Sequence, residues 1–95
     1  MEERKEGLAV GTEEQVVTIV TEPTVAFTYR GYVPAVVVRV EQTGEERLLY
    51  ISAASIANPL ESLRQKNAGK FSGIKMGVRK ETADRFAKYI VREVT

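Results

Sequence analysis

The 95-residue chain contains no cysteine and no histidine. These absences exclude disulfides, thiolate nucleophiles, imidazole bases and nearly every zinc site. Ser52 and Ser55 therefore lack a histidine that could activate them. The paired glutamates Glu13-Glu14 and Glu45-Glu46 would point to opposite faces of a strand, so neither pair forms a carboxylate dyad. We expect neither an enzyme nor a protein that binds a cofactor or a metal.

Long hydrophobic runs are also missing. No apolar stretch approaches the roughly 18 residues of a membrane span, and the first residues, Met-Glu-Glu-Arg-Lys-Glu, lack the apolar segment of a signal peptide. We expect a cytoplasmic protein, or an intracellular one of viral or phage origin, that does not act at a membrane. The chain has few Asn and Met residues beside plentiful Glu, Lys and Arg, a composition typical of thermophiles.

The excess of one charge sign is small, at a net +1, but the charges are unevenly distributed. Residues 1–61 carry five Lys/Arg and ten Glu, a net of −5, whereas residues 62–95 carry nine Lys/Arg and three acids, a net of +6. Nucleic-acid-binding domains usually have a pronounced excess of Lys and Arg. A positive groove in this protein would therefore have to come from the uneven placement of its cations.

Length and polarity predict one domain with an N-terminal extension. Residues 1–12 are polar and are expected to form a mobile arm, with a single domain over 13–95. β-Branched residues dominate after Gln15, and 24–30 alternates with a period of two. We interpret 14–30 as one long strand that bends at a proline, because Pro within a strand marks an edge or a bulge.

A hairpin follows this strand. Its strands are expected over Val33–Glu41 and Glu45–Ile51, joined by Gln42-Thr43-Gly44. A three-residue loop ending in Gly fits a type I turn followed by a left-handed glycine. This register would place Arg39 opposite Arg47, whereas a two-residue loop would shift it by one residue and separate the two arginines.

A single short helix is expected next. Ser52 can cap a first turn through Ile56, and Asn58-Pro59-Leu60-Glu61 is a stronger start signal. In that segment Asn suits the N-cap, Pro the first helical position and Glu a capping box. Gly69 is the expected C-terminal stop.

Two further strands are expected at 70–79 and 85–94, separated by a polar loop. The sequence thus predicts a mainly β fold of five strands, with the one helix between the third and the fourth.

This element order resembles that of small OB-fold single-stranded-DNA-binding proteins of archaea and their viruses. The resemblance spans roughly 15–94 and rests on Leu48-Leu49-Tyr50-Ile51-Ser52-Ala53-Ala54-Ser55, running into Pro59-Leu60, and on Gly73-Ile74-Lys75-Met76-Gly77-Val78-Arg79. It implies a five-stranded, partly open OB-like barrel. It also implies that nucleic acid binds across the second and third strands, between the loops that join strands one to two and four to five.

A single strand of nucleic acid presents one phosphate charge per nucleotide and a flat base. Its binders combine cations along a groove with exposed aromatic rings, and each stacked base contributes about 1–3 kcal/mol. On this chemistry we predict binding residues in the two loops, on the face between them and on the fourth strand: Arg30, Tyr32, Arg39, Arg47, Phe71, Lys75, Arg79, Lys80 and Arg85.

Several of these residues have structural alternatives. Tyr29 and Tyr32 could pack at the end of a barrel, and Phe71 could cover the end of the helix. Like charges directly opposed on a sheet are destabilising, so Glu41 or Glu45 could neutralise the two arginines of the hairpin.

The sequence favours non-catalytic binding of single-stranded nucleic acid with little sequence preference, with DNA favoured over RNA. The alternative is an assembly module without nucleic-acid binding. In that case the Val-rich stretch 33–40 and the apolar last strand would be buried in a homodimer through sheet edges.

Overall fold

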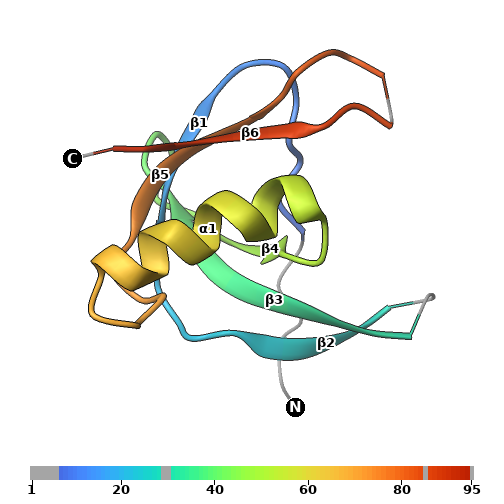
Figure 1. Cartoon of the computed structure of the whole chain (residues 1–95). Helices are drawn as coiled ribbons and strands as arrows, with labels where there is room; N and C mark the ends of the chain where they lie inside the picture. The colour runs from blue at the N-terminus through green and yellow to red at the C-terminus, as the bar shows by residue number, and fades with distance from the viewer. Residues whose placement is uncertain (1–6, 29–30, 85, 95) are drawn as a thin grey trace.

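The computed structural model describes residues 7–28, 31–84 and 86–94. Its elements follow in the order β1 (Gln15–Ile19), β2 (Thr24–Thr28), β3 (Gly31–Val40), β4 (Glu46–Tyr50), α1 (Ala54–Lys66), β5 (Lys75–Lys80) and β6 (Tyr89–Glu93) (Figure 1). The prediction of a mainly β fold is confirmed. The strands number six rather than five, and the helix lies between the fourth and the fifth of them.

The strands form one antiparallel sheet centred on β3. β1 and β2 follow one another along one edge of β3, and β4 lies along its other edge. β5 pairs with β1, and β6 pairs with β5. The strand predicted over 14–30 is thus two consecutive strands, because Pro23 lies between them and has no N–H to give to a ladder.

The sheet is open rather than closed. Within the described ranges no ladder joins β4 to β6, so the predicted barrel is not confirmed. Gly7 and Leu8 instead run beside β4, where the Leu8 N–H donates to the Leu48 carbonyl at 2.8 Å. The Gly11 carbonyl then accepts from the Lys80 N–H at 2.7 Å. Residues 7–11, predicted to belong to a mobile arm, therefore contact the sheet, and residues 1–6 of that arm lie outside the described residues.

The β3–β4 hairpin differs from its predicted register by one residue. Arg39 pairs with Glu46, and Val38 pairs with Arg47. The prediction that the two arginines oppose each other is therefore wrong, because the loop is one residue longer and ends at Gly44, whose φ is 74°. A slip of one residue moves every side chain to the other face. The arginines lie on opposite faces of the sheet.

Helix α1 begins earlier than its capping signal predicts. Ala53 occupies the N-cap position without a side-chain hydrogen bond, and Pro59 lies inside the helix. Asn58 is therefore not the N-cap. Pro59 has no N–H to donate to the carbonyl of Ser55, a loss that packing offsets. The buried side chains that anchor α1 are Ile56, Leu60 and Leu63.

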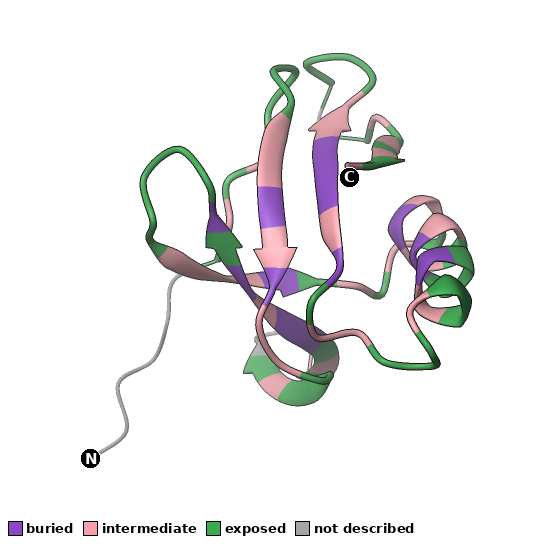
Figure 2. Cartoon of the chain, turned by 90° about the vertical axis from the view of Figure 1, so that its left-hand side faces the viewer, coloured by how far each residue is buried: buried purple, intermediate pink, exposed green. Residues whose placement is uncertain are grey.

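One hydrophobic core lies between the sheet and the helix. Figure 2 shows the buried stretches on the strands and on the side of α1 turned towards them. Leu8 and Val10 pack onto this core from the N-terminal segment. Three residues of the Val-rich stretch 33–40, which the assembly alternative places at a dimer interface, belong to this core. The buried cluster consists of Val17, Ile19, Val36, Val38, Val40, Leu49, Ile56, Leu60, Leu63, Ile74, Met76 and Val78.

Within the described part of the chain, no helix is long and apolar enough to cross a membrane.

Candidate nucleic-acid interface

Two aromatic rings lie side by side on the β2–β3 hairpin. Phe27 and Tyr32 are directly opposed in the ladder, and their ring centroids are 5.2 Å apart with the planes inclined by 67°. The residues are 61% and 75% exposed. Edge-to-face contact of this kind stabilises an aromatic pair. The hairpin therefore presents an ordered pair of aromatic rings to solvent.

The exposure of this pair follows from the length of β3. Side chains alternate along a strand, so Tyr32 and Pro34 share a face with the buried Val36 and Val38. The first residues of β3 extend beyond the helix and the core, and their face is left uncovered. We call the exposed group Val25, Phe27, Tyr32 and Pro34 the hairpin face.

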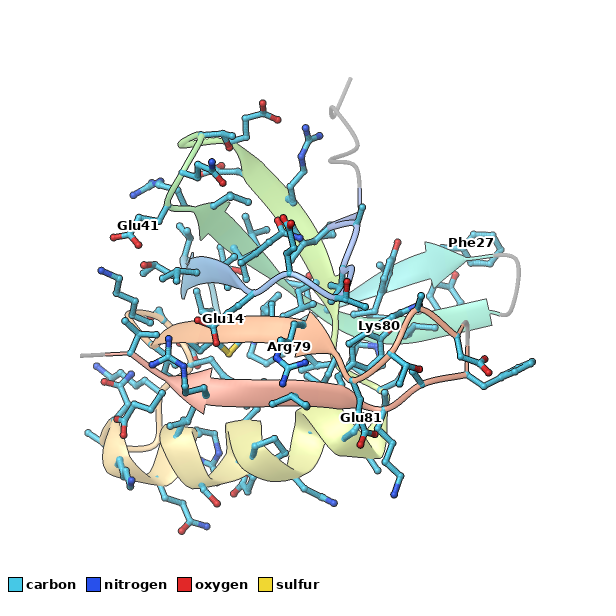
Figure 3. All side chains as sticks on the ribbon, turned by 90° about the horizontal axis from the view of Figure 1, so that it is seen from above. Glu14, Phe27, Glu41, Arg79, Lys80 and Glu81 are labelled. Atoms are coloured by element: carbon cyan, nitrogen blue, oxygen red, sulfur yellow. The ribbon has the colours of Figure 1, made fainter. Side chains whose placement is uncertain are left out.

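A third exposed ring lies in the β5–β6 loop. Phe86 is 83% exposed, and its N–H donates to Asp84 Oδ1 at 2.8 Å. The loop is tied to the helix, because the Tyr89 N–H donates to Ser55 Oγ at 3.0 Å. Lys80 Nζ lies 5.9 Å from the centre of the Tyr89 ring, within the range of a cation–π contact. Figures 1 and 3 show this loop and the β2–β3 hairpin projecting from the same side of the molecule.

Carboxylates accompany the cations on the outer face of the sheet. Thr18 pairs with Arg39 on one side and with Lys75 on the other, which places both cations on this face. Arg39 Nη2 lies 3.3 Å from Glu46 Oε2, and Lys75 Nζ lies 2.8 Å from Glu41 Oε1. Glu41 was one of the two residues that could neutralise the hairpin arginines. It forms its ion pair with Lys75 instead. This face carries paired charges rather than a continuous positive groove.

Arg47 and Phe71 lie away from this face. Arg47 forms an ion pair with Glu45 and lines a depression beside Leu8, below the N-terminal segment. Phe71 is partly buried against the core, and the Arg64 guanidinium carbon lies 5.9 Å from its ring centre. These contacts match the packing alternative for Phe71.

Arg79 belongs to a cluster around Glu14 on β5 and β6. Arg92 Nε donates to the Glu14 carboxylate at 2.9 Å and Nη2 donates at 2.5 Å. The Arg92 hydrogen bond is the largest influence on the pKa of Glu14, which is lowered, and the charge of Arg79 lowers it further. Figure 3 labels Glu14 and Arg79 on this face. The carboxylate crosses directly over Gly77, where an added Cβ would lie 2.4 Å from Glu14 Cδ.

The structure thus separates the nine predicted residues into several groups. Tyr32 lies on the hairpin, and Lys80 lies at the start of the β5–β6 loop. Arg30 and Arg85 fall outside the described residues. The remaining five are spread over the outer face, the depression beside Leu8 and the helix end.

Sequence reasoning missed Phe27 and Phe86 as candidate residues. Phe27 lies on the apolar side of the alternating stretch 24–30, and such alternation is typical of a strand with one buried face. The structure does place Phe27 on the face of the sheet that carries the core, but the core does not extend to this end of β2. Both faces of the last predicted strand are apolar, so periodicity carried no signal for Phe86.

No protein-family model matches the chain, and the searches of curated proteins and of solved structures found no match either. In the described ranges, no group of three or more acidic side chains is placed to hold a metal ion.

Proposed function

We propose that this protein binds single-stranded nucleic acid, preferentially DNA, by stacking bases on the rings at the ends of the β2–β3 hairpin and the β5–β6 loop. The observation that carries the proposal is the exposed Phe27–Tyr32 pair. Every base has a flat face, so stacking on such rings is tolerant of sequence. A contiguous exposed apolar patch, unlike a single exposed side chain, is a common mark of a binding surface.

Strand order supports an OB-type arrangement for this activity. β1 lies between β3 and β5, and β2 continues along the same edge of β3, in the manner of one long bent first strand. In an OB-fold the loops that correspond to β2–β3 and β5–β6 flank the ligand. The N-terminal residues 7 and 8 occupy the edge of β4 that a closed barrel would pair with its last strand.

Electrostatics sets the expected strength of binding. Arg39 and Lys75 already face carboxylates, so these two cations are less available to contact phosphates. Each phosphate contact makes the affinity for a single strand fall by about 0.7 log units per log unit of salt. We therefore expect modest affinity and a shallow salt dependence.

Fluorescence anisotropy with labelled oligo-dT and oligo-U of equal length, at two salt concentrations, tests the proposal. The double variant Phe27→Ala and Tyr32→Ala should bind about tenfold more weakly or worse, because each stacked base contributes about 1–3 kcal/mol. Ile90→Ala on β6 is the matched control, since it removes an exposed apolar side chain elsewhere. Equal affinities of the double variant and the parent protein, or no binding by the parent at low salt, would contradict the proposal.

A further inference from the structure

One edge of the sheet lacks the protection that the other edges have. β2 pairs with β3 on one side, and in the described residues no strand lies along its other side. β4 and β6, the other outer strands, both carry charged side chains, and β4 also has Gly7 and Leu8 beside it. The sequence of β2, Thr-Val-Ala-Phe-Thr, has no charge. Charged residues are a common means by which proteins prevent edge-to-edge pairing.

The backbone of β2 is oriented to accept a further strand. Val25 is paired with Pro34, which has no N–H, so this pair occupies a non-hydrogen-bonded position of the ladder. Accordingly, the Pro34 carbonyl points the other way and accepts from the Ile51 N–H at 3.1 Å. Hydrogen bonding alternates along an antiparallel strand. Ala26 therefore bonds to β3, while Val25 and Phe27 turn their N–H and C=O groups towards the open edge.

We propose that this edge is a self-association surface, in which β2 pairs antiparallel with β2 of a second copy about a twofold axis at Ala26. In this register Val25 of each copy faces Phe27 of the other, and each such pair can exchange both backbone hydrogen bonds. Ala26 faces Ala26 of the second copy. The two ladders β3–β2 then become one continuous ribbon.

The chemistry of the edge favours a second copy as its occupant. Two uncharged strands meet without like-charge repulsion, and an aromatic side chain opposite a β-branched one is a favourable cross-strand pair. The hairpin faces of the two copies also join into one apolar surface, in which Val25 of one copy packs beside Phe27 of the other while the outer side of the ring stays open to solvent. A charged partner, including a polyanion, would gain no ion pair from β2.

The expected dimer is reversible. Specific interfaces usually bury roughly 1,200 Å² or more in total, and a strand pair of this length with its flanking side chains offers a small area. The inference goes beyond the proposed function and does not depend on it. A monomer that binds oligonucleotide and a dimer that binds none are distinct outcomes.

Sedimentation equilibrium over a wide range of protein concentrations tests the inference without nucleic acid. The apparent mass of the parent protein should rise with concentration from that of one chain towards twice that value. Val25→Pro should abolish the rise, because it removes an N–H that faces the open edge and leaves the bonds between β2 and β3 intact. Its thermal unfolding curve checks that it folds.

A charge exchange at the twofold axis tests whether the occupant is a second copy. Ala26→Lys alone and Ala26→Glu alone should each remain monomeric, because like charges would be directly opposed. An equal mixture of the two variants should recover the dimer mass. Gln65→Lys, at an exposed position of α1, is the control and should dimerise like the parent.

A parent protein that stays monomeric at all concentrations overturns the inference. The same result is expected if the edge binds a peptide of another protein instead of a second copy. A dimer that persists in Val25→Pro also overturns it. So does a mixture of the two Ala26 variants that stays monomeric while the parent dimerises.

Discussion

Glu22 joins two parts of the chain that are distant in sequence. It lies in the break between β1 and β2, where its Oε1 accepts from the Phe71 N–H at 3.1 Å and its Oε2 accepts from the Ser72 N–H at 2.9 Å. The Ser72 backbone hydrogen bond, followed by that of Phe71, lowers the pKa of this carboxyl below its ordinary value. The carboxylate thereby fixes the segment that leads into β5.

The lowered pKa of Glu22 gives a pH-dependent prediction. The stabilising effect of a carboxyl with a depressed pKa in the folded state is fully present above its unfolded-state pKa, and it is lost as the pH falls through the folded-state value. Glu22→Gln should therefore lower the free energy of unfolding at pH 7, and the difference from the parent should shrink on acidification below about pH 4. Urea unfolding of the parent and the variant at pH 7 and below about pH 4 measures this difference in the free energy of unfolding.

Glu13→Gln is the matched control for this experiment, because Glu13 is exposed and no hydrogen bond of its carboxylate occurs among the described residues. An effect of Glu22→Gln that is equally large in acid would show that the charge of Glu22 is not the cause.

Residue-level roles were only partly predictable. Tyr32 was predicted to bind nucleic acid from its ring type and an expected loop position; the structure places it on β3 beside Phe27, and its binding role stays a prediction. The hydrogen bonds of the Glu22 carboxylate were not predictable, since its partners are backbone N–H groups some 50 residues away. Such contacts depend on how segments are brought together and leave no periodic signal.

Among the elements, α1 shows how packing overrides a local signal. Asn58-Pro59 matches the sequence pattern of a helix start, yet the helix begins at Ala54. Ile56 is 2% exposed, and burying it requires one more turn at the N-terminus. Strand locations were predictable from hydrophobic alternation. The register of the β3–β4 hairpin was not, because one loop residue decides it.

The position of the helix start gives a prediction at this scale. Ala53 has an extended backbone and no side-chain cap, so Ala53→Asp should raise the free energy of unfolding by about 1 kcal/mol. Asn58→Ala should change it by less than about 0.5 kcal/mol, because Asn58 is exposed within the helix. Denaturant unfolding of both variants measures the two values. A large loss in Asn58→Ala would instead place the helix start at Asn58.

On the scale of the whole molecule, the fold mixes the two oppositely charged parts of the chain. Glu14 and Glu41 from the acidic part meet Arg92 and Lys75 from the basic part, because β1 pairs with β5 and lies beside β3. The uneven charge distribution was visible in the sequence. Its consequence for the surface was not, since strand order decides which charges become neighbours.

The N-terminal segment gives the prediction at the scale of the whole molecule. Leu8 packs on the core while its backbone pairs with β4. Leu8→Ala should lower the free energy of unfolding by about 1–2 kcal/mol, less than the cost at a fully buried site because Leu8 is half-buried. Urea unfolding measures it. An unchanged value would mean that residues 7–11 behave as a free arm.

The central place of β1 affects how the chain can be made in a cell. Gln15 pairs with Val78, so one side of β1 has no strand neighbour until β5 has left the ribosome. A nascent chain that has not yet exposed β5 would display apolar, unpaired backbone along β1, and the sheet could not be completed before β5 emerges. Chaperone engagement during synthesis is therefore most needed between the emergence of β1 and that of β5.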